Sequence, residues 1–328
     1  MKTVGTTIFI FIVLVTLSIL TRGWASEPWP AEKWTSAKTL THLDPAFENN
    51  MSGACYNPET QFFWVCCNGG PSAFWALKES GNGNWEIATK GKKQAKYNLG
   101  QGDLEGICQV DYRNDLVYLM VEGADKIKEY DVSDYGSAKL KNEWDISAHV
   151  PTRRGLGSEG ITFVPDEWLE KGQFTDAEGN LYTSKGGMGG LMFVAHQNGG
   201  RVYVFDLSVG KKDVHFVGSY KTSRAESSGL EFDRSSGRLY VWHNTGPNYL
   251  EVARLSSDTD GNERRLTTVT EFMGPKGGNL EGIAISPAIA KDGLCLIVDD
   301  DNQDGAALML FSQFDSTKFP GKDVAEHP

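Results

Sequence analysis

The chain lacks the short motifs that mark several large classes of enzyme. Its 328 residues contain no Gly-x-Ser-x-Gly turn, no His-Glu-x-x-His pair, no phosphate-binding glycine loop and no Cys-x-x-Cys pair. The usual signatures of serine hydrolases, zinc proteases, P-loop enzymes and dithiol oxidoreductases are therefore excluded. Histidine is also scarce, with six residues in the chain, so any chemistry that needs histidine has few candidates.

Positive charge and cysteine are both in short supply. Lys and Arg total 32 against 43 Asp and Glu, and the formal net charge is −11. Such a chain repels nucleic acid and anionic membranes and is a better host for cations, so we expect no nucleic-acid partner. An odd number of cysteines permits at most two internal disulfides, and free buried thiols are the alternative. The five are Cys55, Cys66, Cys67, Cys108 and Cys295.

Long apolar runs are absent beyond the N-terminal region. Residues 1–25 combine an early lysine, an apolar stretch from Ile8 to Leu20 and a small-x-small site before Ser26, which is the pattern of a signal peptide. The stretch is shorter than the ~20 residues of a spanning helix, so we expect no membrane span. We predict a secreted, extracellular protein whose residues 26–328 form one domain. Its one glycosylation sequon begins at Asn50, where a predicted strand start is a poor place for a glycan.

One pattern is present five times. A dipeptide ending in glycine opens a short apolar segment, and a second apolar segment follows after a turn. Successive repeat glycines lie 53, 54, 69 and 53 residues apart, a period that suits a four-stranded unit and exceeds most helical repeats. The dipeptides are Ser52-Gly53, Glu105-Gly106, Glu159-Gly160, Ser228-Gly229 and Glu281-Gly282. They predict an all-β chain that folds as a single β-propeller with five visible blade repeats.

Two features interrupt the simple repeat. The long third step comes from an insertion, Trp168 to Gly190, which ends in a glycine-rich run and is expected to be a loop on an intact blade. Strand-like pieces also flank the five repeats, at Trp34 to Leu43 and at Ala307 to Phe311. Their pairing leaves the number of blades open between five and six.

The order of serine and glutamate in these dipeptides resembles the SdiA-regulated β-propeller family and, more distantly, phytase-like esterase propellers. The phrases Ser52 to Thr60, Asp103 to Ile107 and Asn279 to Ala284 carry the resemblance, which covers about Ser52 to Phe311. The resemblance implies a propeller fold and a calcium site. It supplies no reaction, because the family has no settled activity. The chain departs from the bacterial pattern in its leader, its cysteines and its third-repeat insertion.

Hairpin geometry predicts where the polar residues gather. In an antiparallel hairpin the start of the first strand lies beside the end of the second, so both positions should face one end of the propeller. The predicted inner ring is Ser52, Glu105, Glu159, Ser228 and Glu281, and the second ring is Asn68, Glu122, His196, His243 and Asp299. Convergent polar groups near the axis favour a binding site. A structural role, in which the glutamates accept backbone N–H bonds and close the ring, is the competing interpretation.

Carboxylates this close together need a counter-charge, and oxygen ligands select Ca²⁺ over Zn²⁺. We therefore expect a calcium ion on this face. Its candidate ligands are Glu105, Glu122, Glu159, Glu281 and Asp299.

A second calcium candidate is the acidic run that ends at Gly305. Asp300, Asn302 and Asp304 match the first half of a calcium-binding loop, in which alternate side chains point inward. The twelfth position would be Phe311 rather than glutamate, so the run is no EF-hand. A solvated acidic turn is the alternative.

Cationic residues occur in the segments that lead into the inner strands, at the same end as the two rings. They are Arg153, Arg154, Arg224 and Lys276. Cations beside a metal-binding face suit an anionic ligand such as a phosphate ester or an acidic sugar. Simple neutralisation of the acidic face is the alternative.

Two functions follow from these observations. The favoured one is a secreted, calcium-binding propeller that recognises an extracellular anionic ligand or a matrix protein without chemistry. The other is a calcium-dependent hydrolase of esterase, lactonase or phytase type, with His196 or His243 as the catalytic base because these two histidines occupy equivalent positions.

Overall fold

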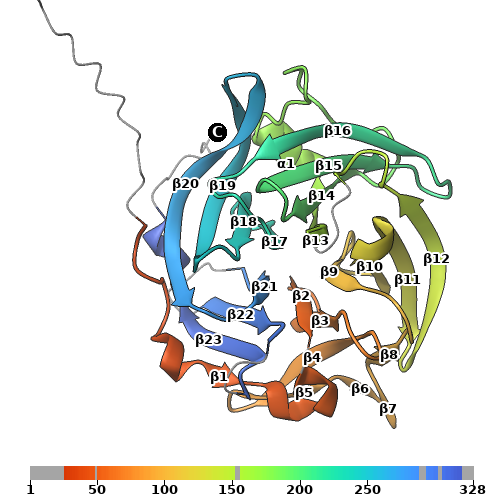
Figure 1. Cartoon of the computed structure of the whole chain (residues 1–328). Coiled ribbons are helices and arrows are strands. Elements are labelled where there is room, and N and C mark those ends of the chain that lie inside the picture. Colours follow the sequence, from red (N-terminus) through yellow and green to blue (C-terminus); the bar gives the residue numbers. More distant parts are fainter. Residues whose placement is uncertain (1–25, 49, 152–155, 288–292, 302–304, 320–328) are drawn as a thin grey trace, which may run out of the picture.

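The computed structural model describes residues 26–48, 50–151, 156–287, 293–301 and 305–319. The predicted signal peptide lies outside these residues, as do Arg153, Arg154, Asn302 and Asp304. Within them, antiparallel sheets radiate from a common centre, which confirms the prediction of an all-β propeller (Figure 1).

Each repeat folds as an antiparallel sheet of four strands. The first contains β2 (Met51–Asn57), β3 (Phe62–Cys67), β4 (Ala73–Gly81) and β5 (Asn84–Ile87). The second contains β9 (Leu104–Cys108), β10 (Leu116–Val121), β11 (Lys126–Asp134) and β12 (Ser137–Asp145). The third contains β13 (Ser158–Pro165), β14 (Gly190–His196), β15 (Arg201–Leu207) and β16 (Val214–Lys221). The fourth contains β17 (Gly229–Asp233), β18 (Arg238–His243), β19 (Pro247–Asp260) and β20 (Glu263–Lys276). The fifth contains β21 (Leu280–Ile285), β22 (Gly293–Asp299), β23 (Leu308–Phe314) and β1 (Lys38–Thr39).

Small elements fill the connections. A further strand, β8 (Lys96–Asn98), pairs with β4, and β6 (Thr89–Lys90) forms a separate hairpin with β7 (Lys93–Gln94). The helical elements are η1 (Trp34–Ser36), η2 (Thr41–Leu43), η3 (Pro45–Glu48), η4 (Glu122–Ala124), η6 (Ser316–Lys318) and the α-helix α1 (Asp166–Lys171). No helix in the described ranges has the length and apolar character needed to cross a membrane.

The predicted hairpins are the first two strands of each sheet. Ala54 faces Val65, Ile161 faces Val194 and Ile283 faces Ile297 across antiparallel ladders. The first strands are buried almost along their whole length because they have neighbours on both faces, whereas an outer strand such as β12 is largely exposed. Burial on both faces explains why the repeats read as continuous apolar runs rather than as alternating ones.

The N-terminal segment completes the last sheet. Lys38 and Thr39 of β1 pair with Leu310 and Met309 of β23, so both flanking pieces belong to the fifth sheet. The piece from Trp34 to Leu43 contains only this short strand, and 3-10 turns replace the remainder of the expected strand.

The third and fourth sheets are joined at their outer edges. Tyr220 and Lys221 of β16 pair in parallel with Arg264 and Arg265 of β20, which makes one eight-stranded sheet (Figure 1). The insertion before β14 leaves the β13–β14 ladder intact, as expected. It is not purely a loop, however, because its first residues complete α1, where Leu169 packs into the core.

The inner strands approach one another closely, and the repeat glycines make this possible. The strands β2, β9, β13, β17 and β21 are neighbours in that order, and β21 returns to β2. A Cβ on Gly106 would fall 2.7 Å from the carbonyl oxygen of Glu159, and one on Gly160 would fall 2.5 Å from that of Ser228. No side chain fits at such distances, so glycine at these positions is a requirement of the packing.

The cysteines are all free thiols and all buried. Neighbouring Cys66 and Cys67 point to opposite faces of β3 and pack in two separate clusters of the core. Of the two interpretations of the cysteines, the structure agrees with buried free thiols and contains no internal disulfide among the five.

Candidate functional site

Three glutamates of the predicted inner ring meet at the propeller axis. Glu105, Glu159 and Glu281 lie near the starts of β9, β13 and β21, and each offers a carboxylate oxygen within 4.8 Å of the other two. All three side chains are buried. We call these three residues the axial carboxyl cluster.

Burial makes ionisation of this cluster unfavourable. The pKa of Glu105 is raised to about 8, first by burial and then by the neighbouring carboxyl groups of Asp103 and Glu122, against the lowering effect of the hydrogen bond from Asn68. The pKa values of Glu159 and Glu281 lie well above the ordinary range, first because of burial and then because of the Glu105 carboxyl beside them. Glu159 and Glu105 also share a hydrogen bond, which requires a proton on one of the two carboxyl groups.

A second acidic group shares Glu105. Asp103, Glu105 and Glu122 also place carboxylate oxygens within 4.8 Å of one another. Burial raises the pKa of Glu122 to about 7, and the Asp103 carboxyl adds to this shift. Sequence reasoning did not select Asp103, although it stands two residues before Glu105 and directly before β9.

Neutral amides, not cations, surround the axial carboxyl cluster. Asn68 Nδ2 donates to Glu105 Oε1 over 3.1 Å, and Asn279 Nδ2 donates to Glu281 Oε1 over 2.9 Å. Glu281 Oε2 is buried and has no hydrogen-bond partner among the described residues. Within the described residues, none of the three glutamates forms an ion pair with Lys, Arg or His.

The predicted acidic run approaches the cluster from β22. Asp299 accepts the backbone N–H groups of Asn279 and Asp301, so it supports the turn before β21. Asp300 accepts a hydrogen bond of 3.0 Å from Asn279 Nδ2, and its charge raises the pKa of Glu281. The structure therefore brings Asp300 toward the cluster through Asn279. Asn302 and Asp304, the rest of this calcium candidate, lie outside the described residues.

The axial carboxyl cluster offers several hard oxygen ligands, and no cationic side chain among the described residues pairs with them. Three carboxylates supply up to six oxygens, which matches the six to eight oxygen ligands of Ca²⁺. A divalent cation would replace the protons that the cluster otherwise has to hold. The backbone also links neighbouring sheets at this face, since Gly160 N–H donates to Ser228 O over 2.6 Å, and the hydrogen bond from Asn68 to Glu105 links the first sheet to the second.

His196 is fully buried and held as a neutral imidazole. The backbone N–H of Asn198 donates to Nδ1 over 3.1 Å, and Nε2 lies 3.2 Å from the carbonyl oxygen of Pro151. Burial lowers the pKa of His196 to about 4, against the smaller effect of the Pro151 hydrogen bond. Both ring nitrogens thus have partners outside the axial carboxyl cluster.

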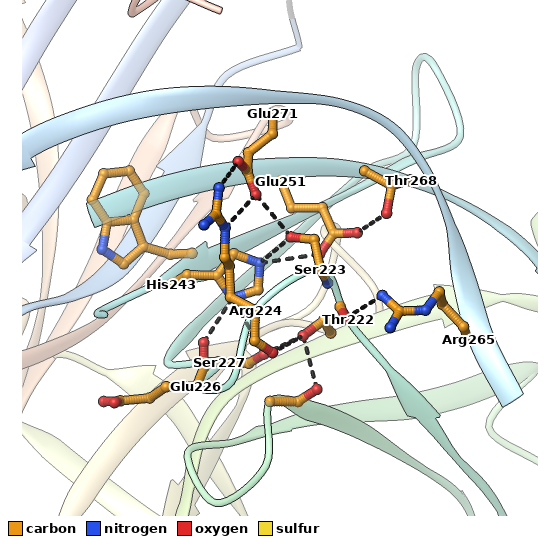
Figure 2. A network of polar contacts seen from close by, with 12 residues as sticks. Thr222, Ser223, Arg224, Glu226, Ser227, His243, Glu251, Arg265, Thr268 and Glu271 are labelled. Carbon is orange, nitrogen blue, oxygen red and sulfur yellow. Dashed lines mark hydrogen bonds and ion pairs between the residues drawn. The ribbon is translucent and has the colours of Figure 1, made fainter. Parts of the chain in front are cut away.

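His243 belongs to a buried polar network (Figure 2). Its Nδ1 lies 2.7 Å from Glu226 O and its Nε2 lies 3.0 Å from Glu251 Oε2. The hydroxyl of Ser223 also lies 3.3 Å from Nε2, and that of Ser227 lies 3.5 Å from Nδ1. Glu251 and His243 are both completely buried and form an ion pair. Sequence reasoning did not identify Glu251, which follows His243 by eight residues on the adjacent strand.

The predicted cationic residues do not form one cluster in the described structure. Arg224 forms an ion pair with Glu271 (Figure 2). It also stacks on Tyr249, with its guanidinium carbon 3.7 Å from the ring centre. Lys276 is exposed at the end of β20. Arg153 and Arg154 lie outside the described residues.

No protein-family model matches the chain, and no curated protein matches it. Among solved structures it is similar to the Cps50 (Swd1) β-propeller domain of Myceliophteria thermophila, with 10% identity and a TM-score of 0.40 over 80% of this chain and 96% of that one. It is also similar to the Dos1 propeller, with 11% identity and a TM-score of 0.38 over 77% of this chain and 56% of that one. The likeness concerns the fold alone.

Proposed function

We propose that this protein binds a calcium ion at the axial carboxyl cluster and that the ion-binding face recognises an extracellular anionic ligand. The observation that carries the proposal is the meeting of three buried glutamates with no cationic partner among the described residues. Clustered buried carboxyl groups are costly unless protons or a cation neutralise them. Glu105, Glu159 and Glu281 would hold the ion, and Asp103 and Glu122 would extend the negative face beside it.

Secretion is part of the proposal. The signal-like composition of residues 1–25 supports it, and extracellular calcium is abundant enough to occupy sites of modest affinity. A bound ion would also supply the positive charge that an anionic partner, such as a phosphate ester or an acidic sugar, needs on this acidic protein.

We also propose a relationship to the SdiA-regulated propellers. The order of serine and glutamate before the repeat glycines supports this relationship. Close packing of the backbone accounts for the glycines, but not for the residues that precede them. The close packing does not require glutamate at three of the five preceding positions.

Calcium titration of the purified protein by calorimetry tests the metal site. Glu159→Gln should weaken calcium binding at least about tenfold, because it removes one hard anionic ligand while it keeps the side-chain shape. The control is Glu129→Gln on β11, which removes the same charge from a half-buried glutamate outside the cluster. Absence of calcium binding to the unmodified protein, or equal affinities of both variants, would overturn the assignment.

A panel of phosphate esters, lactones and acidic polysaccharides then separates recognition from hydrolysis. Binding of an acidic polysaccharide or phosphate ester without turnover, and only with calcium present, supports the proposed recognition. Calcium-dependent turnover of any member would instead favour the hydrolase.

A further inference from the structure

A second candidate site lies where the inner strands end, at the opposite end from the axial carboxyl cluster. A cavity of about 260 Å³ is lined there by residues at or near the last positions of β2, β17 and β21, including Tyr56, Asp233 and Ile285. Its volume is below the ~300–1,000 Å³ of sites for drug-sized ligands, so it suits a smaller molecule. Most of its lining is aromatic or aliphatic, and Tyr112, Phe232 and two prolines complete that lining.

Glu231 brings an unpartnered carboxyl oxygen to this cavity. Its side chain is 4% exposed, and its Oε2 is buried without a hydrogen-bond partner among the described residues. The backbone N–H of Tyr56 is the hydrogen-bond donor that the carboxyl group does have. A buried polar atom without a partner is destabilising, so this oxygen can gain a hydrogen bond from a ligand.

Arg234 brings an unpartnered donor to the same cavity. Its Nη1 donates to Val110 O over 2.9 Å and its Nη2 donates to Gln109 O over 2.8 Å, while its guanidinium carbon lies 3.9 Å from the ring centre of Tyr112. These contacts fix the guanidinium across the axis, between β17 and the turn after β9. Its Nε is buried and has no partner in the described part of the chain.

The third charged group of the cavity, Asp233, already has partners. Asp233 Oδ1 accepts from the backbone N–H and the hydroxyl of Ser235, and Asp233 Oδ2 accepts from the hydroxyl of Ser236. Glu231 and Arg234 therefore define the chemistry of a ligand, which must present both a donor and an acceptor. An amine alone would leave Arg234 Nε unpaired, and a carboxylate alone would leave Glu231 Oε2 unpaired.

We propose that this cavity binds a free amino acid with an apolar side chain. The ammonium group of the ligand donates to Glu231 Oε2, its carboxylate accepts from Arg234 Nε, and its side chain packs on the apolar lining provided by Tyr56 and Ile285. Charge-assisted hydrogen bonds are the strong class, and both would form away from bulk water.

Protonation of Glu231 supplies an independent signature of binding. Burial, and next the Asp233 carboxyl, hold the pKa of Glu231 well above its ordinary range, against the smaller effects of Tyr56 N–H and Arg234. The neighbouring thiols of Cys55 and Cys108 also have raised pKa values and stay neutral, so Asp233 and Arg234 are the charged neighbours. This shift favours the protonated form of Glu231 before the ligand binds. An ammonium group would take the place of this proton, and the proton would pass to solvent.

Calorimetry of the full chain with three matched probes tests the proposal. The probes are L-phenylalanine, 2-phenylethylamine, which lacks the carboxylate, and 3-phenylpropionate, which lacks the ammonium group. L-phenylalanine should bind about tenfold or more tightly than either of the others, because one charge-assisted hydrogen bond contributes at least this factor. Titrations in buffers of different ionisation enthalpy should show release of about one proton per ligand, the Glu231 proton.

Two variants assign the ends of the ligand. Glu231→Gln should weaken L-phenylalanine about tenfold or more, abolish proton release and leave 3-phenylpropionate unchanged, whereas Arg234→Lys should weaken L-phenylalanine and leave 2-phenylethylamine unchanged. Glu129→Gln is the control and should bind like the unmodified protein. Thermal unfolding reports whether each variant folds. If Arg234→Lys does not fold, the test rests on the affinity of Glu231→Gln and on the number of protons released on binding.

Three results would overturn the proposal: no binding of L-phenylalanine, equal binding of all three probes, or unchanged binding by Glu231→Gln. The cavity shares no residue with the axial carboxyl cluster, so Glu159→Gln should bind L-phenylalanine normally. Failure of calcium binding and failure of amino-acid binding are therefore distinguishable.

Discussion

Gly282 of β21 lies directly against the backbone of Ser52 of β2, and this contact closes the ring between the last and the first sheet. A Cβ on Gly282 would fall 2.5 Å from the carbonyl oxygen of Ser52 and 3.0 Å from Cα of Gly53. The two residues are far apart in the chain, yet they belong to equivalent dipeptides of the repeat, Ser52 as the first residue of one and Gly282 as the second residue of the other. The same kind of contact that joins neighbouring sheets therefore also joins the last sheet to the first.

Gly282→Ala should destabilise the protein by about 1–3 kcal/mol or more, since the methyl group must displace the backbone of a neighbouring sheet. Urea unfolding followed by fluorescence measures the change. Gly123→Ala is a suitable control, because a Cβ there would meet Asp103 Oδ2 at an ordinary 3.6 Å. Equal losses for the two variants would show that close packing at Gly282 is not the cause.

Calcium should raise the unfolding temperature of the unmodified protein, because a ligand that binds only the folded state stabilises it by mass action. At a concentration 100 times the dissociation constant the gain is about 2.7 kcal/mol. Glu281→Gln should reduce this gain at a fixed calcium concentration, since its Oε2 is the buried unpartnered oxygen of the cluster. Melting curves that are identical with chelator and with calcium would contradict the site.

Without divalent cations, stability should fall as the pH rises from about 7 to about 8.5. The pKa values of Glu122 and Glu105 are about 7 and about 8 in the folded protein, against ~4.3 in an unfolded chain, so the folded state binds more protons in this window. Stability decreases with pH wherever the folded state binds more protons. His196, with a pKa of about 4 when folded, is largely neutral in both states here and adds little.

Calcium should oppose this loss, and its stabilising effect should be larger at the higher pH because the carboxyl groups bind the ion only after they lose their protons. Unfolding in chelator and in calcium at both ends of the window measures the two trends. A stability that is independent of pH in chelator would mean that the cluster ionises freely.

Glu251→Gln should cost about 1–3 kcal/mol of stability, because it removes a completely buried carboxylate and leaves its buried hydrogen-bond donors without a charged acceptor. Burial alone would raise the pKa of Glu251, but hydrogen bonds from His243, Thr268 and the backbone of Ser223 bring it below its ordinary value. The exposed pair of Lys93 and Asp134 is the matched control, and Asp134→Asn should change stability by less than about 1 kcal/mol. Chemical unfolding of both variants compares them, and similar small losses would contradict a stabilising role of the Glu251 network.

The repeated hairpins and the face on which their polar residues gather were predictable from the sequence. A strand alternates its side chains with a period of two, and a hairpin sets its own register, so Glu105 and Glu122 could be placed at one end of the same sheet without coordinates. The repeat glycine marked the start of each hairpin, whereas the close packing that it permits appeared only in the structure. By contrast, the helical turn α1 within the insertion and the 3-10 turns around β1 escaped prediction because short segments depend on what they pack against.

The sequence by itself determined the type of unit, the number of visible repeats and the polar character of one face, because these properties arise within single hairpins. Only the tertiary structure decided which charges meet. The approach of Glu281 to Glu105, the pairing of His243 with Glu251 and the fixing of Arg234 beside Glu231 all depend on contacts between strands or across the axis. Such distances follow from how the sheets tilt and close around the centre, and no local pattern along the chain records that geometry.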